Sequence, residues 1–150
     1  MANEIRTKDV AEAAFTITIN GLADGAGRWS TAVTNTNDQP AALVSVRIYT
    51  SADAPDVGSA YTVYLLRDLG TIAVDEWSGS DAAYTPGNAP ILGTVVVTAD
   101  ATTYFSACFD TAPLGPLGPT FGIGIWNASG QTSNAANCTA FYNYYVPEVQ

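Results

Sequence analysis

The sequence contains no histidine, and its only cysteines are Cys108 and Cys138. The lack of histidine excludes Ser-His-Asp and Cys-His nucleophile arrangements, imidazole acid–base catalysis and every zinc site with a histidine ligand. Two cysteines are also too few for a four-cysteine zinc site. These absences exclude many classes of enzyme before any motif is considered.

Charged residues are scarce, at 13% of the chain, whereas a typical soluble domain has about 25%. Five Lys or Arg residues against fourteen Asp or Glu residues give a formal net charge of -9. Binding to DNA or RNA depends on basic side chains that neutralise phosphates, so this balance argues against a nucleic-acid partner. Hydrophobic residues make up 47% of the chain, which argues against intrinsic disorder.

The sequence also lacks a hydrophobic run near the roughly 20 residues that a membrane helix needs. Its first ten residues contain no apolar core of the kind that marks a secretion signal. We therefore expect a protein that is made in a cytoplasm and has no membrane partner. In that compartment Cys108 and Cys138 are expected to be buried thiols, and a disulfide between them is the alternative.

The sequence is instead rich in segments where apolar and polar residues alternate with a period of two, which is typical of half-buried β-strands. In the segment 15–20, Phe15, Ile17 and Ile19 share one face, while polar residues form the other. Segments of this kind predict strands at 15–20, 29–34, 42–49, 61–66, 91–98, 102–109, 121–127 and 138–145, with a further short strand possible at 71–74.

About eight strands without an amphipathic helix predict an all-β fold, an antiparallel sandwich of jelly-roll type. The length of 150 residues suits one domain, which we place at residues 15–150. Within the strand at 121–127, Gly122 and Gly124 predict a face that another backbone or an aromatic ring approaches closely.

Residues 1–14 show no alternation and hold five of the nineteen charged residues of the chain. One interpretation is a frayed tail, as chain termini often are. The other is an extended N-terminal arm that orders against a neighbouring subunit. The candidate contact residues of such an arm are Ile5, Arg6, Lys8, Val10 and Phe15.

No group of residues predicts catalysis, a bound cofactor or a metal ion. Asp75 and Glu76 are the only adjacent acidic pair, and neighbours on a strand point to opposite faces, so the two carboxylates would not converge. The loop carboxylates at 53–56 and 78–81 lack the spacing of a calcium loop. Exposed aromatic rings stack on sugars or on partner surfaces, which makes Trp77 and Trp126 candidate glycan contacts.

The surface is short of the residue that most often protects sheet edges. Lys8 is the only lysine of the chain, although lysine commonly prevents unwanted pairing along exposed strand edges. We therefore expect some edges and apolar faces to be covered by other copies or by a larger assembly. This expectation favours a structural or interaction protein over an enzyme.

Several strand and turn segments, taken in chain order, are the most recognisable part of the sequence: FTITINGLA at 15–23, GRWSTAV at 27–33 with Asn35, GSDAAYT at 79–85, Leu92-Gly93, and FGIGIWNASG at 121–130. Together they resemble a group of small β-sandwich proteins of tailed bacteriophages, called decoration, cement or head-knob proteins. None of these segments is a catalytic signature.

The resemblance implies a non-enzymatic virion protein, made in the host cytoplasm, that sits on the capsid surface. Its partner would be the major capsid protein, and its function would be to stabilise the shell by bridging neighbouring subunits. Icosahedral sites favour a homo-oligomer, with a trimer first. The alternative is a tail or fibre accessory protein, or a receptor-binding module that recognises host surface glycans, since one fold serves many functions.

Overall fold

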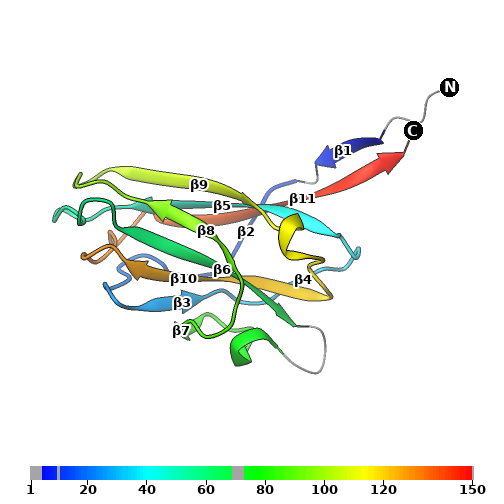
Figure 1. Cartoon of the computed structure of the whole chain (residues 1–150), viewed down its shortest axis with the longest axis horizontal. Helices are drawn as coiled ribbons and strands as arrows, with labels where there is room; N and C mark the ends of the chain where they lie inside the picture. The colour runs from blue at the N-terminus through cyan, green and yellow to red at the C-terminus, as the bar shows by residue number, and fades with distance from the viewer. Residues whose placement is uncertain (1–4, 10, 69–72, 150) are drawn as a thin grey trace.

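The computed structural model describes residues 5–9, 11–68 and 73–149, which form two antiparallel β-sheets packed face to face (Figure 1). The first sheet contains β1 (Ile5–Asp9), β2 (Ala13–Ala14), β5 (Ala41–Tyr49), β9 (Tyr104–Asp110) and β11 (Thr139–Val149). The second sheet contains β3 (Gly27–Trp29), β4 (Val33–Thr34), β6 (Ala60–Asp68), β7 (Ala82–Tyr84), β8 (Ile91–Val96) and β10 (Thr120–Ala128). Two 3-10 turns, η1 (Val74–Glu76) and η2 (Ala112–Leu114), complete the elements.

The strands pair in the order of a jelly roll. The N-terminal strands β1 and β2 pair with the last strand β11, β3 pairs with β10, β5 with β9, and β6 with β8. This double ribbon is rolled up so that β11 lies beside β5 and β10 lies beside β6. The arrangement confirms the predicted all-β, jelly-roll sandwich.

The expected number of about eight strands is too low, because the described residues contain eleven strand segments. Two of the additional segments, β2 and β4, are only two residues long. Pairings this short leave no alternation in a sequence. The other two, β1 and β7, add an edge beside β11 and an edge beside β3, while the predicted strand at 15–20 is missing.

The core lies between the sheets and is built from the inward side chains of the long strands. On β5 these are Val44, Val46 and Ile48, all fully buried, and on β10 they include Ile123 and Ile125. Alternation places every second residue of each strand in this layer, as the sequence pattern predicts. The residues that the structure describes include no helix long and apolar enough to cross a membrane.

The segment 15–20 is not a regular strand, although its alternation is correct. Phe15 and Ile19 are buried, whereas Thr16 and Thr18 are exposed. The backbone N–H of Phe15 donates to the carbonyl oxygen of Ala140 in the first sheet, while the Thr16 carbonyl oxygen accepts from Thr31 beside the second. The segment therefore crosses between the sheets, and alternation alone does not distinguish such a crossing from a strand. The expected strand at 29–34 is likewise divided into β3 and β4.

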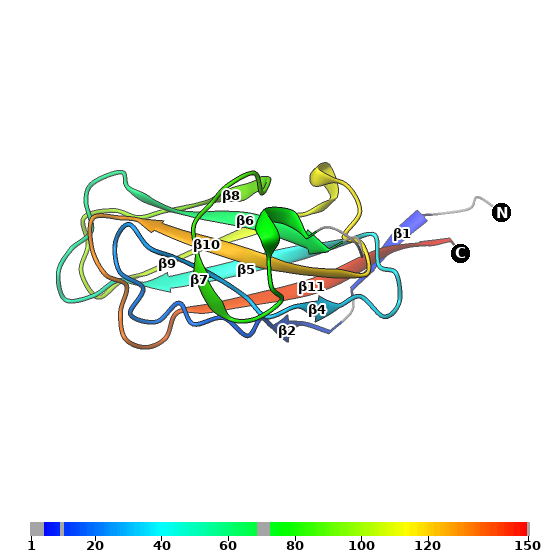
Figure 2. The ribbon, with the colours of Figure 1, turned by 90° about the horizontal axis from the view of Figure 1, so that it is seen from below.

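The outer side of the second sheet is covered by the chain itself over β3, β10 and part of β6. The segment 73–90, which carries η1 and β7, crosses in front of β10 in Figure 2. A Cβ atom at Gly122 would lie 2.5 Å from the ring of Trp77, and one at Gly124 would lie 2.5 Å from the ring of Tyr84. The close approach predicted at these glycines is confirmed, since only glycine leaves room for both rings.

Two stretches of the N-terminal residues, 5–9 and 13–14, form the strands β1 and β2, whereas residues 11–12 are not in a strand. Strand β1 pairs with β11 from Ile5 opposite Val149 to Asp9 opposite Tyr145, and β2 pairs with the same strand. In both views this two-stranded ribbon of β1 and the end of β11 projects from one end of the sandwich (Figures 1 and 2). We refer to residues 5–9 and 145–149 as the terminal ribbon.

Candidate interaction surfaces

The outer face of the first sheet has no covering segment among the described residues. We call this surface the open face and define it by the outward residues of its three long strands. Their neighbours in each strand point into the core, which leaves these residues on the other side. They are Leu43, Ser45, Arg47 and Tyr49 on β5, Tyr104, Ser106, Cys108 and Asp110 on β9, and Thr139, Phe141, Asn143 and Tyr145 on β11.

Aromatic rings dominate one end of the open face. The rings of Tyr49 and Tyr104 are stacked, with centroids 4.4 Å apart and planes 22° from parallel. The guanidinium carbon of Arg47 lies 5.0 Å from the centroid of the Tyr104 ring, a distance suited to a cation–π contact. Tyr104 is nevertheless 51% exposed, so one side of this cluster is available to a partner.

Arg47 differs from the other arginines whose side chains the structure describes. Arg28 donates from Nε to Asp81 at 2.6 Å, and Arg67 donates to the carbonyl oxygens of Leu114 and Pro116. Arg47 has no hydrogen-bond acceptor or carboxylate partner within the described chain, and it is exposed. Its guanidinium group is therefore free to bind an anionic group from outside.

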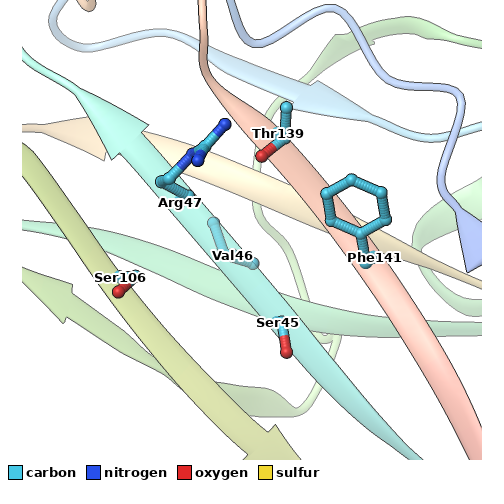
Figure 3. Close-up of a pocket in the computed structure, with 6 residues that line it drawn as sticks. All are labelled: Ser45, Val46, Arg47, Ser106, Thr139 and Phe141. Carbon is cyan, nitrogen blue, oxygen red and sulfur yellow. The ribbon is translucent and has the colours of Figure 1, made fainter. Parts of the chain in front are cut away.

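A shallow hollow of about 290 Å³ lies beside Arg47 on the open face (Figure 3). Its polar lining consists of the Arg47 side chain and the hydroxyl residues Ser45, Ser106 and Thr139, and the ring of Phe141 forms its apolar wall. The lining residues come from three adjacent strands, β9, β5 and β11. The hollow is a place where a side chain or a small polar group from a partner fits.

Asp110 is the second charged residue of the open face and lies at the opposite end from the stacked tyrosines. Its Oδ1 atom accepts a hydrogen bond from the Tyr145 hydroxyl at 2.5 Å and another from the backbone N–H of Ala112. Burial, together with the hydrogen bond to Asp110 and its negative charge, raises the pKa of Tyr145 to about 12. These contacts hold the carboxylate in place on the sheet surface.

Both cysteines are free thiols, so the disulfide alternative is not observed. Cys138 is buried as expected, and its sulfur accepts a hydrogen bond from the backbone N–H of Tyr49 at 3.3 Å. Burial raises the pKa of this thiol. Cys108 was expected to be buried but is exposed, because it alternates in phase with the outward residues of β9 and sits in the middle of the open face.

The two tryptophans predicted as glycan contacts do not form an exposed aromatic cleft. Trp77 is only 5% exposed, and its indole N–H donates to the Ser30 carbonyl oxygen at 3.0 Å. The loop that carries Trp77 folds back over the second sheet, so the ring packs on Gly122 instead of facing solvent. Trp126 is half-buried, and its ring packs over Gly27.

The arm residues proposed as capsid contacts are placed in three different ways. Ile5, Arg6 and Lys8 lie in β1, within the terminal ribbon. Phe15 belongs to the core rather than to an arm, since it is buried and its ring meets that of Phe121 edge-on with centroids 6.0 Å apart. Val10 lies outside the described residues.

Asp75 has a structural role in the covering segment. Its carboxylate accepts hydrogen bonds from the backbone N–H groups of Gly87, Asn88 and Ala89 and from the Tyr84 hydroxyl. Burial raises the pKa of this carboxyl, but these hydrogen bonds outweigh it and hold the pKa below its ordinary value. All of these donors lie within the segment 73–90, so the Asp75 carboxylate fastens that segment to itself.

No protein-family model matches the chain, and no curated protein matches it either. Among the described residues, no group of three or more His, Cys, Asp or Glu side chains is placed to hold a metal ion. The sequence pattern identified the strands of the open face but not the face itself. The outward residues at 43, 45, 47 and 49 were visible as the second face of an alternating segment. Nothing in the sequence pattern showed which of the two sheets would be covered by another segment of the chain.

Proposed function

We propose that the protein is a non-enzymatic virion protein of a tailed bacteriophage that binds the outside of the assembled capsid. In this proposal it bridges neighbouring major capsid protein subunits and thereby stabilises the shell. The observation that carries the proposal is the terminal ribbon, which projects from the sandwich at one end (Figure 1). The sequence resemblance and the jelly-roll sandwich support the same proposal.

The terminal ribbon has the properties of a segment that binds another protein. A two-stranded ribbon without a covering layer is marginally stable in water. Strand β1 stands at the end of the strand order, and none of the described residues forms a strand along its outer edge. Such an edge offers a row of backbone N–H and C=O groups to which a neighbouring sheet or extended segment adds. The ribbon would gain its missing partner on the capsid.

The charge of the protein suits a position on the outside of a shell filled with DNA. The net charge of -9 disfavours contact with nucleic acid. Attachment would then depend on backbone pairing and apolar contacts at the ribbon rather than on basic patches. Each bound copy would add contact area between capsid subunits, and that area would oppose the outward pressure of the packaged genome.

The first test is the number of copies per particle, measured by quantitative mass spectrometry on purified virions relative to the major capsid protein. A ratio near the number of capsomer sites is expected. A handful of copies per particle, or none, would contradict the capsid proposal. The same measurement separates capsid decoration from a location in the tail.

The second test is a binding assay with undecorated capsids and a variant that lacks residues 1–9. This deletion removes β1 but keeps β2 and the buried Phe15, so the sandwich retains its core contacts. We expect the deletion to abolish co-sedimentation with capsids. The control is Val57→Asp, which changes a loop side chain that is 85% exposed and lies outside the ribbon. Unchanged binding by the deletion variant would show that the ribbon is not the attachment site.

The alternative function is a tail or fibre module that binds host glycans. The observation that favours it is the hollow beside Arg47, where an aromatic ring, a cation and three hydroxyl residues lie together. A sugar-binding role predicts that Arg47→Ala and Phe141→Ala each abolish retention on host cell-surface glycans. Retention equal to that of the wild-type protein would remove this hollow as a glycan site.

A further inference from the structure

We infer that the open face pairs with the open face of a second copy of this chain, about a twofold axis. This inference concerns the sheet surface beside the terminal ribbon, with which it shares only Tyr145, and it does not depend on capsid attachment. It begins with the contrast between the two sheets. On the outer side of the second sheet, the segment 73–90 covers β3, β10 and part of β6, whereas the described residues provide no cover for the aromatic groups of the open face.

The charges of the open face complement each other under a twofold rotation. Arg47 and Asp110 are its only charged residues, so this face has no net charge on a protein whose net charge is -9. Two copies therefore meet here without the repulsion that the rest of their surfaces would produce. In a contact with twofold symmetry, a residue of the first copy binds a residue of the second, and the same two residues pair again with the copies exchanged.

The strand register places the two charges at matching distances from the centre of the face. Ser45 lies opposite Cys108 in the middle row, Arg47 lies one row away on β5, and Asp110 lies one row away in the other direction, opposite Leu43. A twofold axis that runs across the strands through the middle row exchanges the two outer rows. The Arg47 side chain of one copy then lies over Leu43 of the other, one strand spacing of about 4.8 Å from Asp110.

The dimer would thus contain two ion pairs, each between Arg47 of one copy and Asp110 of the other. Arg47 is the exposed guanidinium group that lacks an acceptor within the described chain, and Asp110 Oδ2 accepts no hydrogen bond there. The aromatic rings around these groups would be removed from water at the same time. A second copy therefore satisfies both the charges and the apolar area of this face.

The size of the face sets the expected affinity. It presents twelve outward residues per copy, fewer than the roughly 20–30 residues a side of a standard interface. We therefore expect a weak dimer with a dissociation constant in the micromolar range or above. This twofold pair differs from the trimer that the resemblance implies.

Sedimentation equilibrium of the full chain over a concentration series tests the pairing. The wild-type protein is expected to form a dimer, and either single reversal, Arg47→Asp or Asp110→Arg, is expected to raise the dissociation constant at least tenfold. The double variant, which carries both reversals, is expected to recover the wild-type value. A monomer at every concentration, a trimer, or a dimer that ignores these reversals would overturn the inference.

Two further measurements keep the test independent of folding. Because Asp110→Arg removes the hydrogen bond from Tyr145, Ser45→Arg provides a second variant, which places like charges from both copies at the centre of the contact. It is expected to give a monomer with an unchanged melting temperature. The same axis brings the two Cys108 thiols face to face, so a short bismaleimide is expected to cross-link the wild-type protein but not Cys108→Ser. Dimers of Ser45→Arg, or no cross-link in the wild type, would contradict the proposed axis.

Discussion

The carboxylate of Asp75 offers the sharpest test of how the covering segment is held in place. We predict that Asp75→Asn destabilises the protein, because the amide has a single, weaker acceptor oxygen and turns an NH2 group toward at least one of the four donors at this site. The backbone of Asp75 has a φ of 54°, in the left-handed region, and asparagine tolerates that region as well as aspartate does. The substitution therefore changes the charge while keeping the backbone preference.

The magnitude follows from the number of bonds. Hydrogen bonds to charged groups contribute about 1.5–3 kcal/mol and neutral ones about 0.5–1.5 kcal/mol, so each weakened bond costs about 1 kcal/mol. Four weakened or lost bonds give at least about 4 kcal/mol, which solvent screening at this partly exposed site reduces to about 2–3 kcal/mol. For a domain of this size, the melting temperature is then expected to fall by roughly 5–10 °C.

The pH dependence of this loss identifies its cause. The pKa of Asp75 is lower in the folded protein than in the unfolded chain, so its charge stabilises the fold above the unfolded pKa, and this stabilisation disappears as the pH falls through the folded pKa. The difference in unfolding free energy between wild type and Asp75→Asn should therefore be complete at pH 7 and shrink below about pH 4.

Urea unfolding at a series of pH values measures both quantities. The matched control is Asp53→Asn in an exposed loop, where no hydrogen bond to the carboxylate is present. A loss at Asp75 no larger than that at Asp53, or a loss that stays constant down to the acid limit of folding, would refute the role of the Asp75 carboxylate.

Three further predictions concern a close ring contact, a buried amide and the two thiols. Gly124→Ala is expected to cost about 1–3 kcal/mol in urea unfolding, because the added Cβ would lie 2.5 Å from the Tyr84 ring, and a wild-type midpoint would contradict the packing of that ring. Asn127→Ala is expected to cost about 3 kcal/mol in the same assay, since its buried amide donates to two backbone carbonyls and accepts from one N–H, and a loss below about 1 kcal/mol would count against that network. Iodoacetamide is expected to modify Cys108 in the folded protein and Cys138 only after unfolding, as followed by mass spectrometry, and equal rates would contradict the burial of Cys138.

Alternation of apolar and polar residues was enough to predict the sandwich, because its long strands each keep one face in the core. It predicted β5, β6, β8, β9, β10 and β11 to within a few residues. It also indicated the close approach at Gly122 and Gly124, since a glycine in a buried strand leaves space that some other group fills. The pattern did not separate the crossing segment 15–20 from a strand, because both alternate in the same way.

The functional surfaces were harder to predict because they depend on long-range folding. Trp77 looks like an exposed loop residue in the sequence, and only the return of its loop onto the second sheet buries it. Arg47 looks like one polar residue among several in its strand. Its isolation from every described carboxylate becomes visible only when β9 and β11 are placed on either side of it.

The pairing of β2 with β11 also determines when the protein can fold during its synthesis. Ala13 lies opposite Tyr142, so the first sheet joins residues that are separated by most of the chain. Closing a chain over such a distance is slow, because the loss of chain entropy comes before the contacts that offset it. The ribosome has therefore made the chain at least as far as Tyr142 before the first sheet is complete. Until then, the apolar sides of β5 and β6 need protection from other nascent chains.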